Sequence, residues 1–307
     1  MKSGPDYIQF YPTLRCNRAC SFCFNKGIPS LPDMQVDGFR TMLGKLEDAG
    51  VRTLDIMGGE PTLHPDIGSM ISDAEAAGRS VNISSNGADL AALERILRTA
   101  KRTIVGISVN DQGTLDALSE FTRTHSPVVK SVFSADLGPA MVDDILALGP
   151  LRYYLLYRDA LSPEELGETV PFDLFYRAVA TQYDASRVGT VYCSGFLPDA
   201  ASHPELAQVR CPAGTTKLGV LPDGAAYPCN LFFGNERFRL GNILSDPFEA
   251  IWGHPVLSFF RSFSGNACPR LSCELHSLCH GGCPAHSLLH FGSLSAPDPR
   301  CVGRGQF

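Results

Sequence analysis

The chain has 307 residues, 44% of them hydrophobic and 19% charged, enough for one large domain and a small one. Its net charge of −6 argues against a nucleic-acid-binding protein, which would carry a basic surface. No apolar run reaches the ~20 residues of a membrane span. The N-terminus has no hydrophobic signal segment, so we expect a cytoplasmic protein with no nucleic-acid and no membrane partner.

Strand-like and helix-like stretches alternate over the first half of the chain. The expected strands are 7–13, 53–57, 80–84, 103–109, 128–133 and 152–157. The expected helices are 36–49, 66–77, 89–99, 114–122, 139–148 and 171–183. Gly50, Gly78 and Gly149 follow three of these helices, where a left-handed cap is expected. This alternation predicts an α/β fold with a parallel sheet, in which active sites gather beyond the C-terminal ends of the strands.

A group of three cysteines, Cys16, Cys20 and Cys23, follows the first expected strand. Three thiolates leave one iron of a four-iron cluster open, and a catalytic metal site needs an open position. A zinc knuckle is the alternative. The chain has eleven cysteines and no export signal, which also favours metal or iron–sulfur binding over disulfides.

The C-x3-C-x2-C spacing resembles the signature of the radical S-adenosylmethionine (SAM) enzymes. In that family the open iron binds the amino and carboxylate groups of SAM, which an electron splits into methionine and a 5'-deoxyadenosyl radical. The family also has a partial barrel of six βα units. The resemblance therefore implies a partial (β/α)6 radical SAM barrel over residues 1–200, with SAM and a [4Fe-4S] cluster as cofactors and a reducing electron donor as partner.

Further stretches match the same family. The segment that follows the second expected strand resembles the GGEP motif, which holds the SAM amino group; it consists of Gly58, Gly59, Glu60 and Pro61. Two glycines allow backbone to approach a ligand closely, although a plain turn is the alternative reading. The resemblance also places Phe22 near the adenine, and Ser84, Asn86 and Ser108 near the SAM carboxylate and ribose. Capping of the next helix is the alternative for these polar residues.

The C-terminal third, residues 201–307, has a different character. Helical periodicity fades, seven cysteines appear, and residues 217–221 and 225–227 read as a hairpin with an Asp-Gly turn. The cysteine order resembles the SPASM extension of radical SAM enzymes. Gly224-x4-Cys229 fits its pattern, and so does Cys273-x5-Cys279-x3-Cys283. One departure is that four residues, rather than two, separate Cys268 from Cys273.

The SPASM resemblance implies two auxiliary [4Fe-4S] clusters. The first would use Cys211, Cys229 and Cys283. The second would use Cys268, Cys273, Cys279 and Cys301. Cys193 is the cysteine left over, and three readings of it stay open: the fourth ligand of the first cluster, a free thiol that returns a hydrogen atom to a substrate radical, or an inert buried cysteine.

Two features of the sequence bear on the substrate. The first strand begins close to the N-terminus, which leaves no room for the leader-binding domain that peptide-maturing relatives often carry. Asn230 stands where sulfatase-maturing relatives have an Asp that acts as base. We therefore expect a radical SAM epimerase or dehydrogenase of a small polar metabolite, such as an amino sugar or aminocyclitol. Asp111, Arg158 and Asp159 follow expected strands and could bind polar groups of a substrate, but surface charges are the favoured interpretation.

Two alternatives remain. One is a maturase that oxidises or cross-links a ribosomally made short peptide, with a separate leader-binding protein. The other is a non-catalytic iron–sulfur or zinc-binding protein, for which the GGEP motif would be a coincidence.

Overall fold

The computed structural model describes residues 4–134, 137–184, 186–191, 211–270 and 272–302. These residues form two compact units. The first comprises residues up to 19, 25–108 and 212–261, and the second comprises the described parts of 20–24, 109–211 and 262–307. Cys193 lies outside the described residues. Among the described residues, no helix is both long enough and apolar enough to cross a bilayer.

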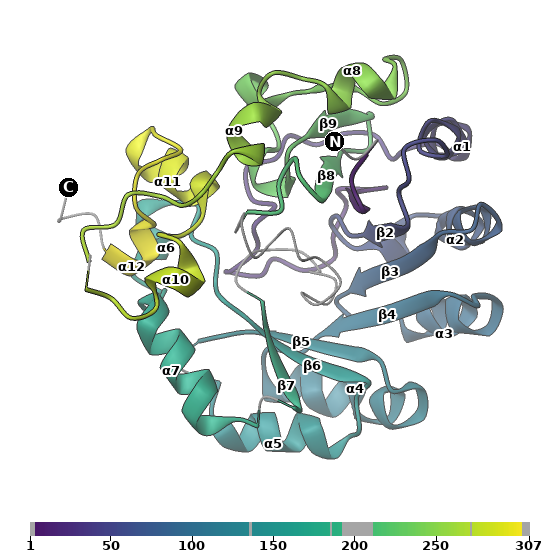
Figure 1. Cartoon of the computed structure of the whole chain (residues 1–307). Coiled ribbons are helices and arrows are strands. Elements are labelled where there is room, and N and C mark those ends of the chain that lie inside the picture. The colour runs from purple at the N-terminus through teal and green to yellow at the C-terminus, as the bar shows by residue number, and fades with distance from the viewer. Residues whose placement is uncertain (1–3, 135–136, 185, 192–210, 271, 303–307) are drawn as a thin grey trace. The chain divides into compact units, whose positions relative to one another are not determined.

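The first unit is built on seven strands of a mostly parallel sheet. Their spatial order is β10-β9-β8-β1-β2-β3-β4 (Figure 1). The strands run over Tyr7–Phe10 (β1), Thr53–Ile56 (β2), Ser80–Ser85 (β3), Thr103–Ser108 (β4), Lys217–Val220 (β8), Ala225–Tyr227 (β9) and Gly241–Asn242 (β10). Strands β8, β1, β2, β3 and β4 are parallel, and β9 and β10 are antiparallel additions at one edge.

Three helices connect these parallel strands, and all three lie along one face of the sheet (Figure 1). They are α1 (Val36–Lys45), α2 (Ile67–Ala76) and α3 (Leu90–Thr99). Helix α1 turns Phe39, Met42 and Leu43 inward, and the Phe39 ring lies 5.2 Å from that of Phe10 on β1. The apolar side of each amphipathic helix thus packs on β-branched and aromatic side chains of the sheet, and this burial holds the unit together.

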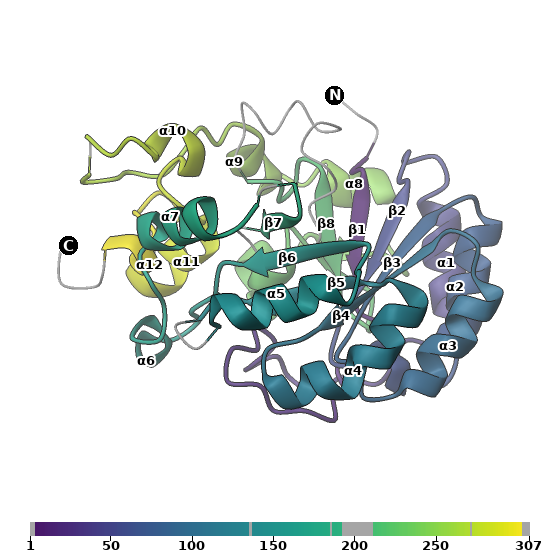
Figure 2. The ribbon, with the colours of Figure 1, turned by 90° about the horizontal axis from the view of Figure 1, so that it is seen from below.

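The second unit contains the three parallel strands β5 (Val128–Val132), β6 (Arg152–Leu156) and β7 (Val188–Val191). Figure 2 shows α4 (Gln112–His125) and α5 (Pro139–Ala147) along one side of β5 and β6. Helices α6 (Pro163–Leu166) and α7 (Phe172–Gln182) follow β6. The predicted strands and helices are present, although the strand expected over 7–13 ends at Phe10 and the helix expected over 36–49 ends at Lys45. Gly50, Gly78 and Gly149 have the expected left-handed φ, of 70°, 77° and 72°.

The cysteine-rich third divides between the two units. Two 3-10 turns, η4 (Asn230–Phe232) and η5 (Glu236–Phe238), and helices α8 (Phe248–Trp252) and α9 (Leu257–Arg261) belong to the first unit. Helices α10 (His276–Cys279), α11 (Pro284–Phe291) and α12 (Pro299–Val302) belong to the second. The expected hairpin is present as β8 and β9, and β8 pairs with β1 rather than standing apart. The expected boundary between residues 200 and 201 lies outside the described residues and stays a prediction.

Candidate active site

The C-terminal ends of β1, β2 and β3 bring three predicted motifs to one edge of the sheet. Phe10 pairs with Ile56, and Ile56 pairs with Ile83, so the three strands finish at nearly the same level. The chain that leads to the cysteine loop leaves β1 there, the GGEP segment leaves β2, and Asn86 follows β3. This is the edge at which parallel α/β folds place their active sites.

The two glycines of the GGEP segment let it dock on the chain that leads into the cysteine loop. Gly58 has a φ of 128°, which a residue with a Cβ rarely adopts. A Cβ at Gly59 would overlap the carbonyl oxygen of Arg15. The backbone amides of Gly59 and Glu60 donate to the carbonyls of Thr13 and Arg15 at 3.0 and 2.7 Å. The close approach that these glycines permit is therefore to the protein's own backbone, whereas we expected an approach to a ligand.

The Glu60 carboxylate is buried, with the residue 1% exposed, and it binds four donors of the protein. Oε1 accepts from the backbone N of Thr62 at 3.1 Å, its hydroxyl at 2.7 Å and the Ser85 hydroxyl at 2.9 Å. Oε2 accepts from the backbone N of Asn86 at 2.7 Å. A carboxylate offers about four acceptor sites. Glu60 therefore holds the ends of β2 and β3 together, and a role as a SAM ligand stays a prediction.

Asn86 extends this network to the first cysteine. Its Nδ2 donates to Oδ1 of Asn17 at 2.8 Å and lies 4.0 Å from Sγ of Cys16. The thiol of Cys16 is thus linked through Asn86 to Glu60. Ser84 is half-buried near the end of β3, and Ser108 is half-buried at the end of β4.

The residues of the cysteine loop are only partly buried. Cys16 is exposed, whereas Cys20, Phe22 and Cys23 are half-buried. A turn brings the second and third cysteines of the motif together, because the backbone N of Cys23 donates to the Cys20 carbonyl at 3.2 Å. Exposed or half-buried thiols leave room for a cluster and its ligand.

Two supporting residues escaped the sequence analysis. Asn25, two residues after the last cysteine of the motif, donates its side-chain amide to the carbonyl of Gly58. Arg15 forms an ion pair with Asp33 and donates to the carbonyl of Leu63 at 2.6 Å. Burial opposes the ionised form of Asp33, but hydrogen bonds from Arg15 and Thr13 lower the pKa of its carboxyl overall. Loop residues with these partners carry no periodic signal that a single sequence could reveal.

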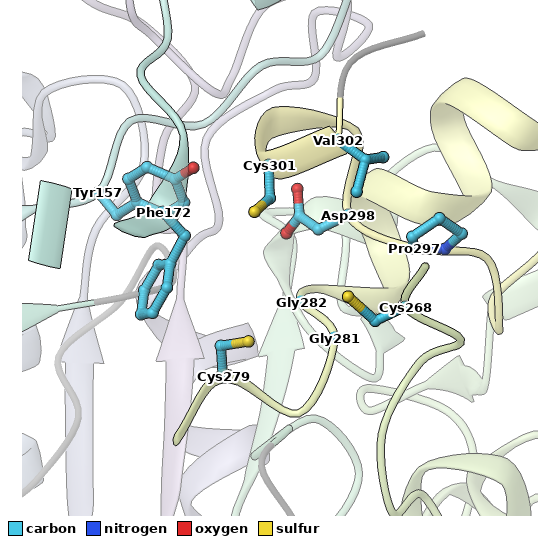
Figure 3. A pocket seen from close by; sticks show the side chains of 10 residues that line it. All are labelled: Tyr157, Phe172, Cys268, Cys279, Gly281, Gly282, Pro297, Asp298, Cys301 and Val302. Carbon is cyan, nitrogen blue, oxygen red and sulfur yellow. The ribbon is translucent and has the colours of Figure 1, made fainter. Parts of the chain in front are cut away.

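Three thiols of the predicted second auxiliary cluster line one cavity in the second unit, as Figure 3 shows. They belong to Cys268, Cys279 and Cys301, and the walls between them include Tyr157, Phe172 and Asp298. Burial raises the pKa of the Cys301 thiol. The fourth predicted ligand, Cys273, is half-buried, and its backbone N donates to the Arg270 carbonyl at 3.0 Å.

The donor set of this cavity fits an iron–sulfur cluster bound by cysteine thiolates. Among the described residues, no three Cys, His, Asp or Glu side chains stand close enough to hold a metal ion. A cluster of four irons spaces its thiolates further apart than a single ion does, so that finding bears on zinc rather than on the cluster. The predicted ligands of the first auxiliary cluster, Cys211, Cys229 and Cys283, are all buried.

Two of the three charged residues at the strand ends are placed differently from our expectation, whereas Asp111 is exposed as expected. Arg158 and Asp159 are only 8% and 9% exposed, so the interpretation as surface charges is wrong for both. Asp111 caps α4, its Oδ1 accepting from the backbone N of Thr114 at 2.8 Å. Asn230 is 3% exposed at the start of η4.

Comparison with known proteins identifies both parts of the chain. The model of the radical SAM superfamily matches residues 10–128, and that of the SPASM iron–sulfur cluster-binding domain matches residues 211–284.

Several curated proteins resemble the chain over most of its length. It is 28% identical to mycofactocin maturase MftC of Mycobacterium ulcerans, over 97% of this chain and 88% of that protein. It is 25% identical to a PqqA peptide cyclase of Streptomyces rochei, over 94% of this chain and 87% of that protein.

A solved structure shares the fold. SuiB of Streptococcus suis, bound to S-adenosylmethionine, matches with a TM-score of 0.75 at 21% identity, over 97% of this chain and 77% of that one. The predicted α/β fold is thereby confirmed, and the two matched domains bring SAM and [4Fe-4S] clusters as cofactors. The chain therefore belongs to the radical SAM superfamily and carries a C-terminal SPASM iron–sulfur domain.

Proposed function

We propose that the chain is a maturase that oxidises or cross-links a ribosomally made peptide. The observation that carries this proposal is the similarity to two peptide-modifying proteins, MftC and a PqqA peptide cyclase, over 94–97% of this chain. The similarity spans both the radical SAM and the SPASM parts. Such coverage supports a shared function of the whole chain rather than of one domain alone.

The small-metabolite epimerase or dehydrogenase that the sequence favoured has less support. It depended on the expectation that no leader-binding domain accompanies the first strand, and on Asn230. A separate protein that binds the leader peptide would remove the first objection. The second bears only on the sulfatase-maturing type, in which a carboxylate acts as base. Peptide maturation, the alternative reading of the sequence, therefore becomes the main one.

Residues of this chain would prepare the site in three ways. Cys16, Cys20 and Cys23 would hold the SAM-binding cluster, while Glu60 and Asn86 fix the loops around it through the hydrogen bonds at 2.7 and 2.8 Å. Phe22 would pack against the adenine. When bound, SAM would supply a radical that takes a hydrogen atom from the peptide, and the auxiliary clusters would accept the electron that remains on the peptide.

The predicted ligands of the first auxiliary cluster would keep water from that cluster. Cys229 and Cys283 are each 6% exposed, and Cys211 is 8% exposed. Asn230, directly after Cys229, offers an amide and not a carboxylate. A proton released by the peptide on oxidation would therefore leave to solvent or to another group, and not to this position.

Incubation with two substrates tests the proposal. The protein is reconstituted with iron and sulfide without oxygen, and then given SAM, a reductant and either a synthetic precursor peptide, chosen from short reading frames near its gene, or an aminocyclitol. We expect 5'-deoxyadenosine to form with the peptide, together with a peptide mass lowered by the loss of hydrogen. The Cys20→Ala variant should form neither product.

Activity with the aminocyclitol instead of the peptide would contradict the proposal. If 5'-deoxyadenosine formation rises with the aminocyclitol but not with the peptide, and the peptide mass is unchanged, the protein acts on a small metabolite. The radical SAM assignment itself would stand in that case, because SAM cleavage would still depend on Cys20.

A further inference from the structure

A buried ion pair stands beside the cysteine cavity of the second unit. The side chains of Asp298 and Arg300 are 5% and 0% exposed. The guanidinium binds the carboxylate with two parallel hydrogen bonds, from Nε to Oδ1 at 3.0 Å and from Nη2 to Oδ2 at 2.7 Å. This forked geometry is the strongest form of the Arg–carboxylate contact.

Further contacts hold the guanidinium of Arg300 in place. Its Nη1 donates to the Arg158 carbonyl at 3.1 Å and lies 3.5 Å from Oδ1 of Asp159. Its central carbon lies 4.4 Å from the ring centroid of Tyr157, which gives a cation–π contact. A buried ion pair adds little net stability compared with well-packed apolar residues. Stability alone is therefore a weak explanation for this arrangement.

Asp298 contacts residues from both predicted auxiliary ligand sets. Its Oδ2 accepts from the backbone N of Cys283 at 2.9 Å, and its carbonyl accepts from the backbone N of Cys301 at 3.1 Å. It also lines the cavity shared by Cys268, Cys279 and Cys301 (Figure 3). Gly282 has a φ of 108°, and a Cβ there would overlap the Cβ of Asp298. The glycine is thus what lets Asp298 lie against the cysteine loop.

We propose that Asp298 and Arg300 position ligands of both auxiliary clusters and set the reduction potential of the second one. The inference rests on the assignment of Cys268, Cys273, Cys279 and Cys301 to one cluster, and not on the identity of the substrate. Reduction adds one negative charge to a cluster. A carboxylate in the cavity wall opposes that charge, and a guanidinium behind the carboxylate favours it. Both effects are strong where water is excluded.

The test is a redox titration followed by electron paramagnetic resonance. It uses protein that carries Cys16→Ala, Cys20→Ala and Cys23→Ala and is reconstituted without oxygen, so that only auxiliary clusters titrate. The signal of the second cluster is identified as the one that Cys268→Ala removes. Asp298→Asn keeps an oxygen for the amide of Cys283 but loses the charge, and it should make the potential more positive. Arg300→Gln should make the potential more negative.

Shifts of opposite sign distinguish an electrostatic role from a structural one, because distortion of the cluster would not follow the sign of the charge removed. The double variant Asp298→Asn/Arg300→Gln should return close to the unmodified potential. Arg177→Gln is the matched control, because it removes an arginine from an ion pair of the same unit that is 61% and 72% exposed. Solvent screens the charge of Arg177, so the reduction potential of the second cluster should be unchanged in this variant.

Three results would overturn the inference. One is that Asp298→Asn and Arg300→Gln keep their iron and leave the potential unchanged. Another is that both shift it in the same direction. The third is that Cys268→Ala keeps its full iron content and all of its signals, which would refute the ligand assignment itself.

Discussion

The carboxylate of Glu60 accepts the backbone N–H of Asn86 at 2.7 Å, and it thereby ties the end of β2 to the end of β3. Asn86 in turn lies 4.0 Å from the sulphur of Cys16. The part of the site expected to bind SAM and the part expected to bind iron are therefore connected by two residues.

Glu60→Gln should weaken SAM binding. The amide nitrogen of a glutamine faces a donor wherever it is placed, because all four partners of Glu60 donate. A buried hydrogen bond lost in this way costs about 1–3 kcal/mol. If that cost falls on binding, the dissociation constant for SAM should rise about five- to hundredfold, measured by equilibrium dialysis on the reconstituted protein. Glu94→Gln, on an exposed turn of α3, should bind SAM normally. Equal affinities for the two variants would show that the Glu60 network does not shape the site.

Gly59→Ala should destabilise the fold, because the new methyl group would overlap the Arg15 carbonyl oxygen. Overpacking of this kind typically costs 1–3 kcal/mol. The free energy of unfolding of the cluster-free protein, measured in urea, reports the change without interference from iron. Gly44→Ala is the matched control. A Cβ at Gly44, within α1, meets nothing within 4 Å, so that variant should gain up to about 1 kcal/mol of helix stability. Two variants of equal stability would contradict the docking of the GGEP segment on residues 13–15.

Cys193→Ala tests a prediction that lies outside the described residues. Three full clusters would give roughly twelve irons per chain. If Cys193 is a ligand of the first auxiliary cluster, the variant should lose iron on reconstitution, as Cys229→Ala should. If the thiol is instead a hydrogen donor, the variant should keep its iron and cleave SAM without forming product. Full iron together with full turnover would remove Cys193 from both roles.

Glu75 should make stability depend on pH. Its carboxylate accepts from the backbone N–H groups of Lys101 and Arg102 and from the Thr103 hydroxyl, at 2.6–3.0 Å. Burial opposes ionisation, but these hydrogen bonds lower the pKa of Glu75 from its ordinary 4.5 overall. A lowered carboxyl pKa stabilises the fold above the ordinary value, and that stability is lost as the pH falls through the folded-state pKa.

The measurement is the free energy of unfolding from neutral to acidic pH, for the unmodified chain and for Glu75→Gln. The difference between the two should be largest near neutrality and should shrink as the pH falls below 4.5. Asp116→Asn, on an exposed face of α4, serves as a control whose difference should stay small throughout. A Glu75→Gln difference that is independent of pH would contradict the role of the ionised carboxyl.

Local sequence patterns predicted much of the fold and part of the candidate site. Alternating apolar stretches predicted strands β1 to β6 and helices α1 to α5 and α7, because burial periodicity can be read from the sequence, whereas the short helices α6 and α8 to α12 were not predicted. The cysteine spacing indicated the radical SAM and SPASM domains, which the two family models match at residues 10–128 and 211–284. The contacts of Glu60 with Ser85 and Asn86, of Asn25 with Gly58 and of Asp298 with Cys283 could not be predicted, because they join residues far apart in the chain through loops without periodicity. Arg158 and Asp159 were misjudged because their ion partners, Glu168, Arg300 and His286, lie on other elements.

The pairing of β8 with β1 limits how the chain can be divided. Lys217 through Val220 hydrogen-bond beside Tyr7 through Phe10, so the strand that carries the cysteine loop has a neighbour from the C-terminal third. A fragment ending before residue 211 would leave β1 as an open edge, which favours aggregation. The SPASM region is thus no appendage that could be added to a finished barrel or removed from one. Recombination of this chain with another radical SAM protein would have to exchange the two parts together.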